Sequence, residues 1–337
     1  MSEAAKRSRI LGWGFEVPQT VVTNDDLAPL VDTSDEWVVK RTGIRERRYV
    51  DDDRGSVPLA EIAARRALDV AGLQPADVDA IVCGTLSPDI DFPGNSALLH
   101  ERLGIQPRLA FDIRNQCSGF VYGLSIADQL IRTGGALTVL VVGSEVHSSG
   151  LDYEGGRGRD VTVLFGDGAG AVVVGAGDEE HGLIGMKLHA DGRFAEKLAV
   201  IGPAHKRKPR VDLSVAPPES AFIYPVMEGR MVFKHAVESM TEVVKDVVQE
   251  AGLAVDDIDM LLPHQANLRI NQLVAMGLGI GDDRMANNID RYGNTTAATI
   301  PILLCETVAA GRIAPGDLVC MAAFGAGFTW GAALYRW

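Results

Sequence analysis

The sequence contains few cysteines and no close pair of them. Its 337 residues include four, none of them arranged as Cys-x-x-Cys. Cys83, Cys305 and Cys320 lie among apolar residues. We expect these three to be buried, inert thiols in a reducing cytosol.

The sequence also lacks the features of nucleic-acid-binding, membrane-spanning and exported proteins. Its 32 Lys and Arg against 45 Asp and Glu leave a net charge of −13, which argues against phosphate-backbone binding. The most apolar run, 161–175, is interrupted by Asp167 and falls short of the roughly 18 residues that span a bilayer. Lys6, Arg7 and Arg9 precede no apolar signal segment. We therefore expect a soluble, cytoplasmic protein.

What the sequence does contain predicts an α/β fold. Short β-branched segments alternate with segments of helical periodicity, in a chain longer than the ~100–150 residues of a typical domain. The expected strands are Ala80–Cys83, Ala110–Ile113, Leu137–Val142, Val161–Leu164 and Ala171–Val174, and the expected helices are Leu59–Ala71, Phe120–Thr133 and Phe233–Ala251.

Two internal echoes indicate a duplicated unit. Ala-Gly-Leu at 71–73, followed by Asp-Val-Asp at 77–79, returns 180 residues later as 251–253 and 257–259. The glycine-rich 165–170 likewise resembles 324–328, each expected to follow one strand and lead into another. We therefore predict two similar halves, 1–178 and 179–337. The glycines fit tight turns better than a nucleotide-binding loop, because the order of a dinucleotide fingerprint and the lysine of a P-loop are absent.

One cysteine stands apart from the other three. Cys117 ends a predicted strand and begins an apolar helix. A helix N-terminus favours the thiolate, so we expect the pKa of Cys117 to be lowered. His264, in Pro-His-Gln-Ala-Asn, and Asn294, in Tyr-Gly-Asn-Thr-Thr, complete a widely spaced trio whose side chains suit thioester chemistry.

The chain resembles the β-ketoacyl-acyl carrier protein (ACP) synthase III family of condensing enzymes in the thiolase superfamily. Six motifs occur in the family's order: 34–44, the Cys117 segment, 165–171, 263–269, 293–295 and 327–331. The resemblance implies a dimer of five-layered α-β-α-β-α subunits, each built from two similar halves, and an enzyme without a metal or a tightly bound cofactor.

The same resemblance implies a two-step reaction. Cys117 takes an acyl group from acyl-CoA, malonyl-ACP loses CO₂, and the resulting carbanion attacks acyl-Cys117. His264 and Asn294 would stabilise the enolate oxygen, and the N–H groups of Cys117 and Ala326 would stabilise the tetrahedral intermediate. Asn294 cannot transfer protons, which suits decarboxylative condensation.

Further binding residues follow from the resemblance alone. Those for CoA or its pantetheine arm are Trp37, Arg41, Thr42, Arg157, Gly229 and Asn267; those for carrier docking are Gln265 and Arg269; those for the acyl pocket are Phe92, which would reach across the dimer, and Phe324.

Some positions depart from the family pattern. Asn115, Gln116 and Ser118 flank Cys117 where small alanines are common, which indicates a reshaped or more polar acyl pocket. Ala326 interrupts a run of glycines. The helix after Arg269 lacks docking lysines, so we expect the Lys206–Arg210 cluster, in a long loop at 193–224, to replace them unless that loop is only a solvated surface.

Two alternatives to the condensing activity remain open. The chain could instead transfer an acyl group to a hydroxyl or amine in a specialised pathway, a reaction that releases no CO₂. Less expected is a non-catalytic partner subunit, because the nucleophile is intact. The starter acyl group and the carrier are not determined by the sequence.

Overall fold

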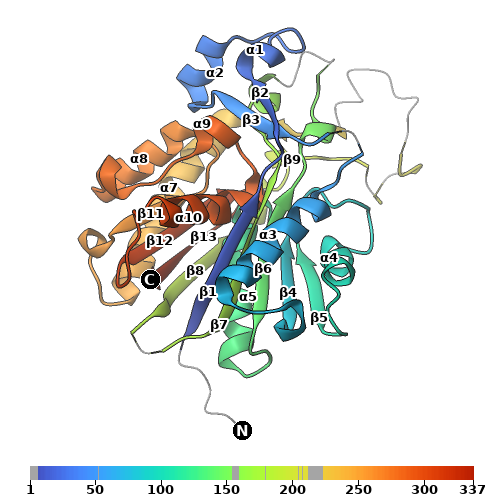
Figure 1. Ribbon diagram of the computed structural model, residues 1–337. Helices are drawn as coiled ribbons and strands as arrows, with labels where there is room; N and C mark the ends of the chain where they lie inside the picture. The colour runs from blue at the N-terminus through green and yellow to red at the C-terminus, as the bar shows by residue number, and fades with distance from the viewer. Residues whose placement is uncertain are drawn as a thin grey trace.

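The computed structural model describes residues 7–51, 53–153, 159–178, 180–203, 205–206, 208–211 and 223–337, and is built around two sheets (Figure 1). The first has the order β1 (Ser8–Glu16), β7 (Gly168–Ala176), β6 (Val139–Glu145), β4 (Ala80–Gly84), β5 (Leu109–Ile113). The second has the order β11 (Met260–Pro263), β12 (Leu318–Gly325), β13 (Thr329–Arg336), β8 (Gly182–Ala190). In the first, β4 runs parallel to β5 and β6; in the second, β11 runs parallel to β12.

Helices cover both faces of each sheet. The helices are α1 (Asn24–Leu27), α2 (Asp35–Thr42), α3 (Ser56–Ala71), α4 (Asn95–Leu103), α5 (Gly119–Arg132), α6 (Arg159–Thr162), α7 (Gly229–Glu250), α8 (Leu268–Leu278), α9 (Ile289–Tyr292) and α10 (Thr299–Ala309). Two short pairs, β2 (Thr20–Thr23) with β3 (Glu46–Tyr49) and β9 (Leu198–Ala199) with β10 (Val226–Met227), lie outside the main sheets.

The elements form five layers, which pack together through two outer apolar cores and one central core that both sheets share. Residues of α3 and α4 pack against the outer face of the first sheet, and residues of α7 and α8 pack against the outer face of the second. Between the sheets, α5 and α10 share one core with strands from both. The predicted thiolase-like α-β-α-β-α sandwich is therefore confirmed.

The repeat predicted from the sequence is visible in the hydrogen bonds. Gly72 ends α3 and Gly252 follows α7, both with φ near 70°. Asp79 Oδ2 accepts the N–H of Leu137 (2.9 Å), and Asp259 Oδ2, 180 residues later, accepts the N–H of Leu318 (2.8 Å). Equivalent aspartates therefore make the same connection in each half: Asp79 joins the start of β4 to β6, and Asp259 joins the start of β11 to β12. The division at residue 178 itself stays a prediction.

The expected elements agree with the structure except at one place. Residues Val161–Leu164, expected as a strand, begin inside α6 and continue in a turn. The glycine-rich 165–170 therefore follows a helix and not a strand, whereas 324–328 joins β12 to β13 as expected. The β-branched side chains of this segment favoured a strand, but the segment packs against α1, α2 and α9 and not in a sheet. We call this group of elements, together with β2 and β3, the lobe around α2.

A buried arginine joins the segments of that lobe to one another. Arg47 on β3 is fully buried. Its guanidinium donates to Asn24 Oδ1 (2.8 Å) and to the carbonyl of Val163 (2.9 Å). The lobe carries α2, which contacts α8 and so lies beside the residues that follow β11. Among the described residues no helix is long and apolar enough to cross a membrane.

Candidate active site

Cys117 lies at the junction of the two halves. It sits in a short 3₁₀ turn, Gln116–Ser118, directly before α5, as the sequence predicted. Gln116 has φ of 43°, so the chain turns sharply there. Gly325, at the end of β12, approaches so closely that an added Cβ would lie 2.7 Å from Cys117 Cβ. The second half therefore packs directly against the nucleophile.

His264 follows β11 and is held on two sides. Its backbone N–H donates to the carbonyl of Ala322 (2.8 Å), and its ring Nδ1 lies 2.7 Å from Thr299 Oγ1. Nε2 is buried and has no hydrogen-bond partner. Burial lowers the pKa of His264 to about 3, so the ring is neutral at physiological pH.

Asn294 is oriented by the turn that follows it. The Thr296 backbone N–H donates to Asn294 Oδ1 (2.8 Å), which leaves the amide NH₂ directed elsewhere. The Asn294 side chain hydrogen-bonds the Cys117 thiol. Thr296 adopts φ of 44°, a left-handed conformation that is unusual for threonine.

These three side chains face one narrow apolar cavity of about 100 Å³. Its wall is mostly apolar, and its volume lies below the roughly 300–1,000 Å³ of a typical ligand site, so it leaves room for a slender group only. Besides Cys117, His264 and Asn294, its wall includes the following residues, several of them named as candidates from the sequence: Phe165, Met227, Gly229, Phe233, Asn267 and Phe324.

The expected activation of Cys117 by the helix N-terminus is wrong in direction. Burial and, after it, the nearby Glu145 charge raise the pKa of Cys117 to about 12, although Asn294 and the Cys117 N–H oppose both effects. The resting nucleophile is therefore a thiol, and its proton has to be removed during the reaction.

Glu145 and His147 are buried neighbours that sequence reasoning missed. Glu145 accepts hydrogen bonds from the N–H groups of Leu86 (3.0 Å) and Ser87 (3.1 Å), while burial raises its pKa. His147 Nε2 lies 3.1 Å from Thr296 Oγ1, and burial lowers its pKa to about 3. Glu145 is the last residue of β6 and His147 follows it, and both support the turn that orients Asn294; a charged residue at the end of an otherwise uncharged strand was the available signal.

Beside the cavity, a tryptophan contacts two arginines in a cluster that we call the rim. The guanidinium carbon of Arg41 lies 4.2 Å from the centre of the Trp37 ring, and that of Arg159 lies 4.6 Å from it. Asn267 Nδ2 donates to the carbonyl of Arg41 (3.0 Å), which joins this cluster to the start of α8. Arg157, the second arginine expected here, lies outside the described residues; Arg159 was missed, two positions further along.

Two of the predicted binding residues have buried side chains that bond their own chain. The Thr42 hydroxyl, buried at the end of α2, donates to the carbonyl of Val38 (2.7 Å) and accepts from Ile44 N–H (3.0 Å). Gln265, expected to dock the carrier, is fully buried, and its amide serves Pro263 and Asn288. Each side chain supports backbone near the site, and a contact of either residue with CoA or the carrier stays a prediction.

The remaining candidates lie at the surface or the edge of the site. Arg269 is exposed, with its guanidinium 5.8 Å from the Phe233 ring. Phe92 is 80% exposed. Ala326 follows Gly325 in the turn between β12 and β13. Ser118, expected to make the pocket more polar, is fully buried and bonds Asn115 O (2.9 Å) and Thr329 Oγ1 (2.6 Å), so it does not face a ligand.

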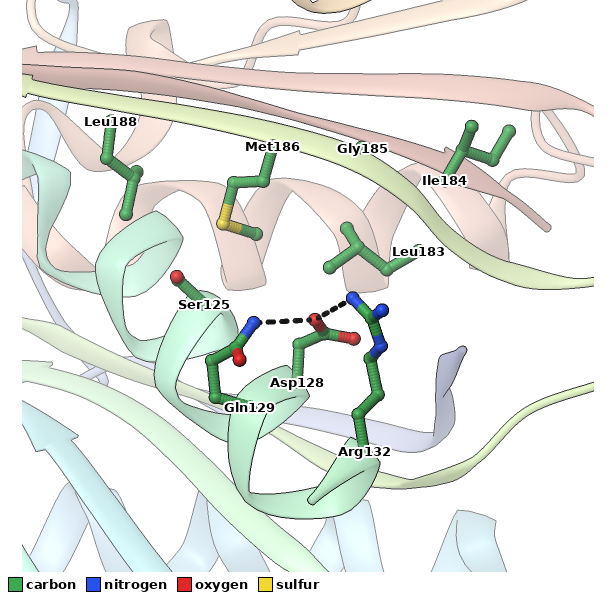
Figure 2. Close-up of a pocket in the computed structure, with 9 residues that line it drawn as sticks. All are labelled: Ser125, Asp128, Gln129, Arg132, Leu183, Ile184, Gly185, Met186 and Leu188. Carbon is green, nitrogen blue, oxygen red and sulfur yellow. Dashed lines mark hydrogen bonds and ion pairs between the residues drawn. The ribbon is translucent and has the colours of Figure 1, made fainter. Parts of the chain in front are cut away.

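A second cavity lies along α5 (Figure 2), and Cys117 is not among the residues that line it. It is lined by α5 and β8, and its polar groups bond one another: Asp128 Oδ2 accepts from Arg132 (3.4 Å) and Gln129 (3.4 Å). At about 1.5 Å per residue, Asp128 lies roughly 16 Å along the helix from Cys117. This cavity therefore contributes nothing to thioester chemistry.

Comparison with known proteins identifies the family. The model of 3-oxoacyl-(acyl-carrier-protein) synthase III matches residues 111–192, and that of its C-terminal part matches residues 248–337. A beta-ketoacyl-(acyl-carrier-protein) synthase III from Chelativorans sp. strain BNC1 is 45% identical, covering 98% of this chain and 99% of that protein. The chain belongs to the synthase III family. It is thus an acyl-transferring condensing enzyme of the thiolase fold.

Solved structures agree with this assignment. The 3-oxoacyl-(acyl-carrier-protein) synthase III of Aquifex aeolicus VF5 is 41% identical, with a TM-score of 0.88 over 98% of this chain and 100% of that one. The priming beta-ketosynthase of the R1128 polyketide pathway is 32% identical, with a TM-score of 0.90 over 100% of this chain and 98% of that one.

Proposed function

We propose that Cys117, His264 and Asn294 carry out the decarboxylative condensation of an acyl-CoA starter with malonyl-ACP. The observation that carries this proposal is their convergence on one apolar cavity, with a buried thiol, an unpartnered imidazole nitrogen and an oriented amide. Such a set can form a thioester and then stabilise an enolate. The products are a β-ketoacyl-ACP, CoA and CO₂.

In the first step the thiol proton moves to His264 Nε2 while Cys117 attacks the acyl-CoA thioester. The tetrahedral oxyanion meets the N–H groups of Cys117 and Ala326 in the close approach of β12 to the nucleophile. Collapse of the intermediate breaks the bond to CoA, whose sulfur takes the proton from Nε2. The acyl group stays on Cys117.

In the second step malonyl-ACP occupies the same cavity and loses CO₂. The electron pair of the breaking C–C bond moves to the thioester oxygen, where the N–H groups of His264 and Asn294 stabilise it. Asn294 suits this role because its amide donates hydrogen bonds and transfers no proton. The carbanion then attacks the carbonyl carbon of acyl-Cys117. Collapse of this second tetrahedral intermediate breaks the bond to the Cys117 sulfur, which leaves as a thiolate and takes up a proton from solvent, so that the resting thiol returns.

The rim supplies the binding of the two thioester donors. Trp37 supplies an aromatic ring for the adenine of CoA, and Arg41 and Arg159 beside it supply guanidinium groups for the phosphates. Gly229 and Asn267 line the passage for the pantetheine arm. Arg269, exposed beside it, would receive the phosphate of the carrier's prosthetic group.

The proposal also includes a surface on which the carrier docks and a homodimer. Arg210 forms an ion pair with Asp91 (2.8 Å), and Lys206 lies 3.7 Å from Glu196, so part of the basic cluster is already paired; docking of the carrier there stays a prediction. Phe92 is next to Asp91 and exposed, which suits a residue that closes the acyl pocket of a partner in a homodimer. The cytoplasmic location stays a prediction as well.

Intact-mass spectrometry tests the function. The protein is incubated with a panel of acyl-CoAs, then with malonyl-ACP, while CO₂ is measured. We expect an adduct that disappears in Cys117→Ala but persists in Cys320→Ala, whose thiol is also fully buried, and that malonyl-ACP discharges with release of CO₂. An adduct that survives malonyl-ACP would contradict the condensation and support acyl transfer to a hydroxyl or amine.

The acyl panel also addresses the starter. A short acyl group is expected if Phe92 limits the pocket; a best substrate of eight or more carbons would remove that argument. The likeness to a priming ketosynthase of a polyketide pathway keeps a specialised pathway as the second candidate, and an unusual starter would favour it.

A further inference from the structure

A buried hydrogen bond joins the turn that carries Cys117 to the start of β13. Ser118 Oγ lies 2.6 Å from Thr329 Oγ1, although the two residues are 211 positions apart in the chain. Both side chains are buried, Ser118 completely. Among the hydrogen bonds of the described residues, no other one links the segment 115–119 to the segment 324–330. We call Ser118 and Thr329 the hydroxyl pair.

The hydroxyl pair is part of a chain of hydrogen bonds that ends on Ala326. Thr329 Oγ1 donates to the carbonyl of Ala326 (3.1 Å). Each hydroxyl has one proton, so Thr329 accepts from Ser118 when it donates to Ala326. The carbonyl of Asn115, which also lies near Ser118 Oγ (2.9 Å), keeps the backbone N–H of Ser118 (3.1 Å). In this arrangement every acceptor of the chain has a donor.

The two ends of this chain carry the N–H groups that the proposed reaction assigns to the tetrahedral oxyanion. Cys117 directly precedes Ser118, and the carbonyl that Thr329 holds belongs to Ala326 itself. Neither the N–H of Cys117 nor that of Ala326 donates to a backbone carbonyl within the described part of the chain. Both are therefore available to an oxygen atom in the cavity.

The spacing of these two donors depends on how closely β12 packs against the Cys117 turn. Gly325 sets the closest approach, because an added Cβ there would lie 3.1 Å from Cys117 N. Such a contact opposes approach, but dispersion between a few atoms resists separation only weakly. An oxyanion hole needs both donors about 2.7–3.1 Å from the position of the oxyanion. The directional bond of the hydroxyl pair supplies the restraint against separation.

We propose that Ser118 and Thr329 are positioning residues that hold the two oxyanion-binding N–H groups at their working distance. The inference rests on the proposed function. The hydroxyl pair acts on the two steps that pass through a tetrahedral intermediate, which are acylation of Cys117 and attack of the carbanion on acyl-Cys117. Loss of CO₂ does not depend on it, because the enolate oxygen has other donors, His264 and Asn294.

The test compares Ser118→Ala and Thr329→Val, which each remove one hydroxyl, with Thr329→Ser, which keeps it. Thr307→Val is the matched control, because the Thr307 hydroxyl is also buried but donates within α10, to the carbonyl of Leu303 (2.6 Å). Adduct formation at saturating acyl-CoA is followed by intact-mass spectrometry. A misplacement of about 1 Å costs up to roughly 10²-fold in rate, so we expect the two variants without a hydroxyl to acylate Cys117 about tenfold more slowly. The other two should match the wild type.

The second half reaction gives a readout that a loss of stability alone would not move. Cys117 is first acylated completely, as checked by mass, and malonyl-ACP is then added while CO₂ and β-ketoacyl-ACP are both measured. A carbanion that is slow to attack takes a proton from solvent and gives acetyl-ACP. In Ser118→Ala and Thr329→Val we therefore expect CO₂ in excess over β-ketoacyl-ACP, with acetyl-ACP making up the difference. The wild type should give CO₂ and β-ketoacyl-ACP in equal amounts.

Two results overturn the proposal. The first is acylation of folded Ser118→Ala, or of Thr329→Val if the alanine variant does not fold, within about threefold of the wild-type rate, well inside the expected loss. The second is slow condensation that still gives CO₂ and β-ketoacyl-ACP in equal amounts, which would mean that the hydroxyl pair supports the site as a whole. If the wild type forms no Cys117 adduct or releases no CO₂, the proposed function fails; if it does both, only the role of the hydroxyl pair is in question.

Discussion

Replacing Gly325 with alanine should displace the Cys117 side chain while leaving every functional group of the site in the sequence. The new Cβ would lie 2.7 Å from Cys117 Cβ and 3.1 Å from Cys117 N. Ordinary contact begins at 3.4 Å, so Cys117 and β12 must separate by about 0.7 Å. Gly325 has no positive φ, so the strain is steric alone.

The magnitude follows from that displacement. A misplacement of about 1 Å costs up to roughly 10²-fold in rate, so we expect Gly325→Ala to acylate Cys117 about 10–100-fold more slowly. Overpacking a buried site costs about 1–3 kcal/mol of unfolding free energy. The variant should therefore fold, with a lower Tm.

The assay is the initial rate of adduct formation with acyl-CoA, followed by intact-mass spectrometry, together with thermal unfolding. Gly192→Ala is the control, because an added Cβ there meets nothing within 4 Å. Acylation of Gly325→Ala at the rate of the wild type would refute the reasoning, since it would show that the two halves can separate at the nucleophile without cost.

Three further predictions concern the site. Asn294→Asp replaces an N–H donor by a carboxylate, so CO₂ release from malonyl-ACP should fall on the order of 10²–10³-fold; unchanged release would exclude Asn294 from the enolate step. Because burial raises the pKa of Cys117 to about 12, the thiolate fraction grows as pH rises, and alkylation by iodoacetamide should accelerate about tenfold per pH unit from about 7 to 10; a plateau by pH 7 would contradict this. Trp37→Ala should raise KM for acyl-CoA about tenfold and leave the reaction with an acyl-N-acetylcysteamine, which lacks the nucleotide, unchanged; equal losses with both would place Trp37 in a structural role.

The parts of the fold that repeat were predictable from the sequence. The Asp79 and Asp259 motifs returned at a fixed offset, and each motif encodes the same local bond from a carboxylate to a neighbouring strand. Local periodicity also located α3, α5 and α7. It failed at Val161–Leu164, where tertiary packing under Arg47 overrides β propensity.

The site residues, too, were predictable from the sequence only in part. Cys117, His264 and Asn294 face one cavity, as their motifs predicted. The motifs did not indicate that Thr42 and Gln265 are buried and bond their own chain, because a motif does not tell which side of the backbone a residue faces. Arg159, Glu145 and Thr299 were missed because their roles depend on contacts between segments far apart in the chain, such as Thr299 with His264.

The helix N-terminus favours the Cys117 thiolate and burial disfavours it, so the relative size of these two effects decides the protonation state. A helix N-terminus stabilises a nearby anion by about 0.3–1 kcal/mol, and by at most about 2 kcal/mol when partly buried. Raising a thiol pKa from its ordinary value to about 12 corresponds to about 4 kcal/mol against the thiolate. Burial therefore outweighs the helix, and the Glu145 charge acts in the same direction.

The protonated resting state of Cys117 determines the order of acyl-CoA binding and proton removal. A buried thiol that holds its proton is protected from solvent electrophiles while the enzyme is empty. Removal of the proton needs a base, and the lone pair on His264 Nε2 is the one that faces the cavity. Since an imidazole with a pKa near 3 accepts a proton only weakly, transfer has to coincide with attack on the thioester, whose developing oxyanion is stabilised at once by backbone donors. On this argument an acyl-CoA in place is part of what makes Cys117 a nucleophile, and alkylation by a small reagent should be slower than acylation at the same pH.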